Sequence, residues 1–320
     1  MKFRKLGASG TKVSVLGLGC NNFGLRMEIE DSRAVIHKAL DLGITMFDTA
    51  DVYGNKGGSE TALGRYLGER RKEIVIASKF GNPMNPSGTL RGASRRYIIS
   101  AVDASLKRLN TDWIDLYQLH RPDPDTPVEE TMRALDDLVR QGKIRYIGCS
   151  GARAWQLIDM QWTAKHHNLN PLTTGEMEYS LLAREPEQEH VPAMLAHGIG
   201  LLPYYPLASG FLTGKYRRGD AMPAGARLTR FRRYADRFMT DANWNILENL
   251  EAFAKVRGHT LLDLAIGWLA AQPVVSSVIA GATKPEQIEI NAKAIEWELT
   301  REDLAEIDRL SGMAKSQEQD

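Results

Sequence analysis

Four side chains that can hold or move a proton lie near the ends of hydrophobic segments in the first 120 residues. Asp48 ends the segment ITMFD, Lys79 lies near the end of IVIASKF, and His120 ends WIDLYQLH. Tyr53 follows Asp48 by five residues, and the glycine after it predicts a turn. A carboxylate, an amine, an imidazole and a phenol brought together would suit proton transfer to or from a substrate oxygen.

Strand-like and helix-like segments that would position these residues alternate along the whole chain. A short hairpin is expected first, from KFRKL through GASG to KVSVL. Segments such as DSRAVIHKALDLG and VEETMRALDDLVRQG show the 3.6-residue periodicity of amphipathic helices. The segments expected to be strands are 15–19, 44–48, 74–80, 113–120, 144–150, 174–180, 199–205 and 277–281. This order predicts an α/β fold, a (β/α)8 TIM barrel with an N-terminal β-hairpin and long loops at its C-terminal face.

A doubly wound open sheet is the alternative, with GLGCNNFG as its phosphate-binding loop. In that segment the third glycine is misplaced and no helix begins directly after it, so we favour the barrel. In a barrel, the ends of neighbouring strands share one rim. We therefore expect Asp48, Lys79 and His120 at similar height on adjacent strands, about 5 Å apart.

We expect residues 1–320 to form a single domain, with a disordered tail from about residue 313. Two long irregular stretches, 81–94 and about 208–240, follow the third and seventh predicted strands. Loops after strands build the active face of a barrel, so both are candidate substrate or cofactor loops. The alternative for the second stretch is a variable surface insertion.

Composition excludes several classes of partner. The chain has 41 Lys and Arg against 40 Asp and Glu, so its net charge of +1 gives no electrostatic footprint for nucleic acid or an anionic membrane. It shows no signal-peptide pattern and no run of 18 apolar residues. Cys20 and Cys149 cannot form a disulfide framework and do not have metal-ligand spacing. We expect a cytoplasmic protein with no metal.

The chemistry expected of the four residues depends on the acidity of the phenol. Its unperturbed pKa of about 10 must fall by about three units, or about 4 kcal/mol, for proton donation at neutral pH. An ammonium about 4 Å away at an effective dielectric near 20 supplies about that much, so we expect Lys79 to lower the pKa of Tyr53. Asp48 would keep Lys79 charged, and His120 would orient a carbonyl oxygen or share its proton. No side chain delivers hydride, which implies a nicotinamide cofactor.

The segments FDTADVYG, ASKF and DLYQLH together resemble the motifs of the aldo-keto reductase superfamily, and the resemblance extends from KFRKLG to the last predicted helix. Members of that superfamily are (β/α)8 barrels that reduce carbonyls with NAD(P)H. The resemblance implies a catalytic tetrad of Asp48, Tyr53, Lys79 and His120. It also implies an alcohol dehydrogenase type of oxidoreductase acting on an aldehyde, ketone or sugar, or on the corresponding alcohol.

The resemblance also implies a cofactor site, with three departures from the family pattern. Gly151 stands where the family has asparagine, Glu176 where it has glutamine, and Ile290 where it has glutamate. The implied set is Ser150, Gly151, Glu176, Tyr204, Pro206, Leu207, Ser209, Gly210, Leu212, Lys215, Gly281, Thr283, Lys284, Gln287 and Asn291. Lys284, at a helix start beside Thr283 and Gln287, would bind a 2′-phosphate, so NADP(H) is favoured over NAD(H).

Glu176 carries a hypothesis of its own. If it is ionised near the nicotinamide ring, it should favour the oxidised, positively charged cofactor, with an unscreened ceiling of about 3 kcal/mol. The alternative is that Glu176 accepts hydrogen bonds from the carboxamide or is partly protonated by burial.

The substrate is less specified. Loop residues expected at the mouth of the site are Asn22, Phe23, Met84, Arg121 and Phe231. An alternative function comes from members of the superfamily that act as cofactor-sensing regulatory subunits of membrane channels, with little turnover. The intact tetrad favours an enzyme.

Overall fold

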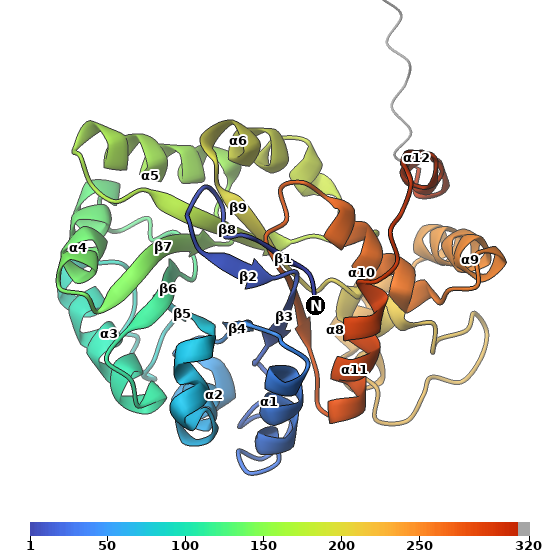
Figure 1. Cartoon of the computed structure of the whole chain (residues 1–320), viewed down its shortest axis with the longest axis horizontal. Coiled ribbons are helices and arrows are strands. Elements are labelled where there is room, and N and C mark those ends of the chain that lie inside the picture. Colours follow the sequence, from blue (N-terminus) through green and yellow to red (C-terminus); the bar gives the residue numbers. More distant parts are fainter. Residues whose placement is uncertain (313–320) are drawn as a thin grey trace, which may run out of the picture.

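The structure, a computed structural model, describes residues 1–312, and the tail predicted from about residue 313 lies outside the described residues. Within that range eight parallel strands form a barrel in the order β10-β3-β4-β5-β6-β7-β8-β9 (Figure 1). Their bounds are β3 Leu16–Gly19, β4 Met46–Asp48, β5 Val75–Phe80, β6 Ile114–Leu119, β7 Ile144–Ser150, β8 Leu172–Glu178, β9 Gly200–Tyr204 and β10 Val278–Gly281. The predicted fold class is confirmed.

The barrel closes between β9 and the segment that leads into β10. There the Leu201 N–H donates to the Val274 carbonyl at 2.8 Å, and the Ser276 N–H donates to the Leu201 carbonyl at 2.9 Å. These bonds satisfy backbone groups that would otherwise form an open sheet edge.

An antiparallel hairpin, β1 (Phe3–Lys5) and β2 (Lys12–Ser14), lies across the barrel in Figure 1. Val13 of β2 and Leu6, which follows β1, are fully buried against residues such as Met46 and Val75, which begin β4 and β5. The hairpin therefore seals the N-terminal end of the barrel and leaves the C-terminal end for a site.

Helices surround the strands, because the apolar stripe of each amphipathic helix packs on the outer face of the barrel. The helix α3 shows how local sequence sets the bounds: the Ser94 side chain accepts from the Tyr97 N–H at its start, and Asn110 ends it in the left-handed conformation. The helices are α1 Ser32–Asp41, α2 Tyr53–Tyr66, α3 Arg95–Leu109, α4 Val128–Arg140, α5 Ala154–His166, α6 His190–His197, α7 Arg227–Arg230, α8 Arg232–Phe238, α9 Asp241–Val256, α10 Leu261–Ala271, α11 Pro285–Ala294 and α12 Arg301–Leu310, with 3-10 turns η1 Gly68–Glu73, η2 Glu185–Glu187 and η3 Ala208–Thr213.

The two predicted long loops differ in the structure. Residues 81–94 contain neither helix nor strand, whereas 208–240 contains η3, α7 and α8. No helix in residues 1–312 is long and apolar enough to cross a membrane.

Candidate active site

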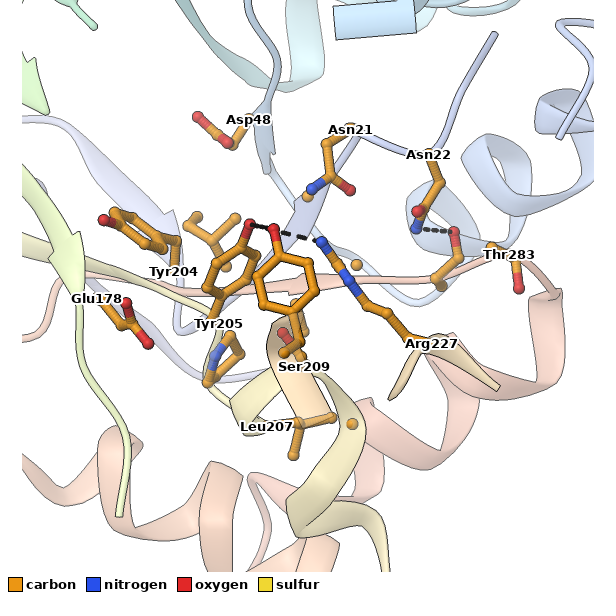
Figure 2. A pocket seen from close by; sticks show the side chains of 18 of the residues that line it. Asn21, Asn22, Asp48, Glu178, Tyr204, Tyr205, Leu207, Ser209, Arg227 and Thr283 are labelled. Carbon is orange, nitrogen blue, oxygen red and sulfur yellow. Dashed lines mark hydrogen bonds between the residues drawn. The ribbon is translucent and has the colours of Figure 1, made fainter. Parts of the chain in front are cut away.

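A cavity of about 980 Å³ opens at the C-terminal ends of the strands. Its wall includes Gly19, Asp48, Ser150, Tyr204 and Gly281, which are the last residues of β3, β4, β7, β9 and β10. Figure 2 shows part of this cavity, with Asp48 and Tyr204 among its lining side chains. It is therefore on the face where loops after strands build active sites in this fold.

The strand register corrects the expected equal height of the candidate residues. Asp48 pairs with Ala77 rather than with Lys79, and Lys79 pairs with Gln118 rather than with His120. Lys79 thus lies two residues, about 6 to 7 Å, farther toward the C-terminal end of the barrel than Asp48, and His120 lies two residues farther than Lys79. This stagger follows from the tilt of barrel strands, and the long Lys79 side chain spans it.

Lys79 is fully buried between two carboxylates. Its ammonium donates to Asp48 Oδ1 at 2.5 Å and to the Thr49 carbonyl at 3.2 Å, and lies 3.2 Å from Glu176 Oε1. Burial acts to lower the pKa of Lys79, but Asp48 and Glu176 outweigh it and raise that pKa well above its usual range. Lys79 is therefore cationic at neutral pH.

Tyr53 and His120 border the cavity above this lysine. Their rings meet edge to face with centroids 5.7 Å apart, and Lys79 Nζ lies 5.1 Å from the Tyr53 ring centroid. Tyr53 begins α2, but the next residues are left-handed, with φ of 67° at Gly54. A side chain at Gly54 would collide with the Phe23 carbonyl, so glycine is required for the turn that positions Tyr53.

The expected lowering of the Tyr53 pKa is wrong for this structure. Burial raises the pKa of Tyr53 above its ordinary value, and the carboxylates of Asp48 and Glu176 raise it further, against the opposing effect of Lys79. The expected lowering rested on Lys79, whereas the folded site adds desolvation and two nearby acids, Asp48 and Glu176. The phenol is thus held in its protonated form.

The charge of His120 favours the first of its two expected roles, orienting a carbonyl oxygen. Burial, Lys79 and Arg121 lower the pKa of His120 to about 3, so the ring is neutral near pH 7. His120 Nδ1 has no hydrogen-bond partner in residues 1–312. A neutral imidazole can orient a carbonyl oxygen through one N–H, but it has no second proton to share.

Most residues of the implied cofactor set border the cavity. The lining includes Ser150, Gly151, Glu176, Tyr204, Pro206, Leu207, Ser209, Gly210, Lys215, Gly281, Thr283, Gln287 and Asn291. Two members do not belong to the lining. Leu212 is fully buried in the hydrophobic core, and Lys284 is exposed beyond the cavity wall.

The segment after β9 fits the phosphates of a dinucleotide. Ala208 and Ser209 adopt left-handed φ values of 46° and 58°, a conformation that costs free energy in residues other than glycine and gathers at functional sites. The Ser209 hydroxyl and Arg227 Nε, both on the cavity wall, are buried without a hydrogen-bond partner in residues 1–312. Lys215 adds an ammonium over Gly210. These unpaired donors match anionic oxygens.

The structure explains two of the three positions at which the chain departs from the family pattern. Gly151 has a φ of 61°, a left-handed conformation that both glycine and asparagine tolerate, which explains why either residue fits the turn. Ile290 borders the cavity and is half exposed, so it supplies apolar contact where the family has a carboxylate.

Sequence reasoning missed several lining residues. Arg26 and Arg227 come from irregular segments, and Tyr205 ends the predicted strand 199–205. Figure 2 shows the Arg227 guanidinium beside Tyr205. The Arg227 guanidinium lies over the Tyr205 ring, 5.0 Å from its centroid. Gln118, which donates to Glu176, could have been predicted to face the site. Residues two apart on a strand point to the same side, so Gln118 faces the same side as His120.

The expected substrate residues are only partly at the cavity. Asn22 and Arg121 line it. Phe23 is fully buried in the core, because the Gly54 turn packs on it, so its prediction as a mouth residue is wrong. Met84 and Phe231 are absent from the lining, although Arg26 lies 5.4 Å from the Phe231 ring centroid.

Comparison with known proteins places this geometry in a family. Residues 15–311 match the model of the aldo/keto reductase family. The chain belongs to the aldo/keto reductase family. This confirms the resemblance read from the motifs and places the chain among the oxidoreductases.

Three relatives illustrate the range of the family. The chain is 39% identical over 305 residues to a probable voltage-gated potassium channel subunit beta of Arabidopsis thaliana, covering 92% of each chain. It is 36% identical over 324 residues to an L-glyceraldehyde 3-phosphate reductase of Escherichia coli O157:H7, covering 97% of this chain and 92% of the relative. It is 35% identical over 312 residues to an uncharacterized oxidoreductase of Bacillus subtilis, covering 94% and 93%.

Proposed function

We propose that this aldo/keto reductase is an NADP(H)-dependent enzyme that transfers hydride between the nicotinamide and a carbonyl or alcohol, with Tyr53 as general acid in reduction and general base in oxidation. The observation that carries the proposal is the buried Asp48–Lys79 ion pair beneath Tyr53 at the cavity wall. When bound, the cofactor supplies the hydride.

The chain's own residues supply the proton. Tyr53 remains protonated at neutral pH and gives its proton only as negative charge develops on the carbonyl oxygen, because an alkoxide is a much stronger base than a phenolate. Lys79 then stabilises the phenolate that forms. The neutral His120 donates one N–H to the same oxygen and fixes its position. Because the raised pKa keeps Tyr53 protonated at neutral pH, Tyr53 is in the form that reduction requires.

The residues that would hold NADP(H) are on the cavity wall. Ser150 would bind the carboxamide, Tyr204 would stack on the nicotinamide, and Ser209, Lys215 and Arg227 would bind the phosphates. At the rim, Lys284 would bind the 2′-phosphate, which is the basis for favouring NADP(H) over NAD(H).

The alternative is a cofactor-binding regulatory subunit with little turnover. Two relatives named as probable voltage-gated potassium channel subunits beta, at 39% and 38% identity, favour this alternative. Turnover separates the two functions, since both predict tight cofactor binding.

The test follows NADPH absorbance with a reactive aromatic aldehyde, a quinone and glyceraldehyde 3-phosphate, the last chosen from the name of one relative. Tyr53→Phe is the control, and it should lose roughly 10²- to 10⁴-fold in kcat while its affinity for NADPH is unchanged. Tight NADPH binding with no turnover of any probe would refute the enzyme and favour the regulatory subunit.

A further inference from the structure

Glu176, one of the departures from the family pattern, contacts the proposed catalytic lysine directly. It is 2% exposed, borders the cavity, and places Oε1 3.2 Å from Lys79 Nζ. Lys79 therefore lies between two buried carboxylates. If both were ionised, the cluster would carry one uncompensated negative charge away from water, which is unfavourable. One of the two carboxyl groups must hold a proton more readily than an isolated acid does.

Geometry identifies Glu176 as that carboxyl group. Asp48 is the closer partner of the ammonium, at 2.5 Å, and so retains its charge. A protonated Glu176 lies within hydrogen-bonding reach of Asp48, which accepts. Burial and the charge of Asp48 raise the pKa of Glu176 to about 8, against the opposing effect of Lys79.

Neighbouring side chains fix which oxygen carries the proton. Thr174 Oγ1 donates to Gln118 Oε1 at 3.2 Å, which orients the amide so that Gln118 Nε2 donates to Glu176 Oε2 at 2.6 Å. Oε2 is thus an acceptor, and the proton belongs on Oε1, the oxygen that faces Lys79. The groups facing Glu176 are Asp48 on β4, Lys79 on β5, Gln118 on β6, Cys149 on β7, Tyr204 on β9 and Tyr53 at the start of α2.

Resting on the proposed function, we propose that Glu176 is a positioning residue that stores the proton consumed in carbonyl reduction and returns it to Tyr53 through Lys79. The Tyr53 proton goes to the carbonyl oxygen as hydride reaches the carbonyl carbon. The phenolate takes a proton from the Lys79 ammonium, whose Nζ lies 5.1 Å from the Tyr53 ring centroid. Lys79 takes the Glu176 proton, and Glu176 is left as a carboxylate that water reprotonates through the cavity. Alcohol oxidation runs the same transfers backwards.

The transfers predict opposite pH dependences for the two directions. The kcat of reduction should be constant at low pH and fall tenfold per pH unit as Glu176 ionises, while the kcat of oxidation rises over the same range. Glu176→Gln cannot hold the proton, so it should lower the kcat of reduction on the low-pH plateau and remove the transition from the pH profile. A uniform loss of kcat with the transition unmoved would mean that Glu176 only supports the structure, and would overturn the inference.

Glu178→Gln is the matched control. Glu178 lies two residues along the same strand and borders the same cavity, but it pairs with Arg237 at 3.0 Å rather than with Lys79. Its replacement removes a carboxylate of equal size from the cavity wall, and should leave the transition of the pH profile in place. If the transition is also lost in Glu178→Gln, the pH dependence comes from the overall charge of the cavity, and the inference is overturned.

A second readout needs no turnover. In protein labelled with ¹³C at the glutamate carboxyl carbons, one resonance should titrate near pH 8 and be missing from Glu176→Gln. If no substrate is reduced but this resonance is present, the proposed function fails and the proton-holding role of Glu176 stands. If the Glu176 resonance titrates in the ordinary carboxyl range, the inference is overturned whatever the activity.

Discussion

Consecutive residues of β5 enter two buried charged clusters on opposite faces of the barrel. Lys79 faces the interior and forms the inner cluster with Asp48 and Glu176. Ser78 faces the helices and forms the outer cluster with Glu60 and Arg108, where Glu60 accepts from Ser78 Oγ at 2.5 Å and from Arg108 Nε at 2.7 Å.

The two clusters differ in access to the cavity, which Asp48 and Glu176 border and Glu60 and Arg108 do not. In the outer cluster Glu60 pairs with Arg108, and Arg108 also donates to Ser105 Oγ at 3.1 Å. A second buried acid, Asp51, adjoins this pair, and burial and Glu60 raise the pKa of Asp51 to about 7 against the opposing effect of Arg108. The inner cluster sets two carboxylates against one ammonium and adjoins the cavity through Asp48 and Glu176. A buried ion pair away from the cavity holds neighbouring elements together, whereas one that borders the cavity can exchange a proton with it.

The largest effect should come from removing each cluster's cation. Lys79→Met is expected to lower kcat by roughly 10²- to 10⁴-fold, because Tyr53 then loses the cation that stabilises its phenolate. Arg108→Met leaves Glu60 buried without its ion pair and should cost about 3 to 5 kcal/mol of unfolding free energy. Steady-state kinetics and urea unfolding measure the two quantities. If folded Arg108→Met loses as much kcat as Lys79→Met, the functional distinction between the clusters fails.

A smaller effect is expected from neutralising one acid in each cluster. Glu176 has a folded pKa of about 8, raised from 4.5, so its contribution to stability is full below pH 4.5 and is lost as the pH rises to about 8. Glu176→Gln should flatten the stability curve over that window. Glu60→Gln should instead lower stability by about 1 to 3 kcal/mol across it, because the amide binds Arg108 less strongly. Parallel curves for Glu176→Gln and the wild type would contradict this.

His120, beside the inner cluster, is expected not to titrate in the neutral pH range. Its pKa, lowered to about 3 by burial and by Lys79 and Arg121, keeps the ring neutral through the neutral range. Its effect on stability should appear only as the pH falls below its unfolded pKa of 6.5, where the unfolded chain gains the proton first. Imidazole NMR should show no His120 titration between pH 5 and pH 8. A His120 titration near pH 6.5 would contradict the burial described for the site.

The smallest effect is expected at the cavity rim, away from both clusters. Lys284→Ala should weaken NADPH binding by roughly five- to tenfold, about 1 kcal/mol, because exposed charge pairs contribute little. NADH binding should not change. Titration calorimetry with each cofactor measures the ratio, and equal losses for NADPH and NADH would show that Lys284 does not select the 2′-phosphate.

The barrel and the four proton-handling residues were predictable from the sequence. Eight hydrophobic segments alternated with amphipathic ones, and each of the predicted strands overlaps an observed strand. The position of Lys79 beside Asp48 followed from neighbouring strands ending at one rim.

Other features depend on geometry that sequence spacing does not contain. The contact between Glu176 and Lys79 depends on the strand stagger, because β5 and β8 are not neighbours in the barrel. The raised pKa of Tyr53 depends on the degree of burial, which reverses the sign expected from Lys79 alone. Phe23 and Leu212 are in loop-like segments but pack into the core.

The most direct test of the central claim, that the inner cluster makes Tyr53 the proton donor to a carbonyl reduced by hydride, is a label-transfer experiment. The protein is given NADPH carrying deuterium at the transferred position, and the alcohol product of an aromatic aldehyde is analysed by mass spectrometry. The wild type should place one deuterium on the carbinol carbon, and Tyr53→Phe should do so at a rate lower by roughly 10²- to 10⁴-fold with unchanged cofactor affinity. Product without deuterium, or an undiminished rate in Tyr53→Phe, would contradict the claim.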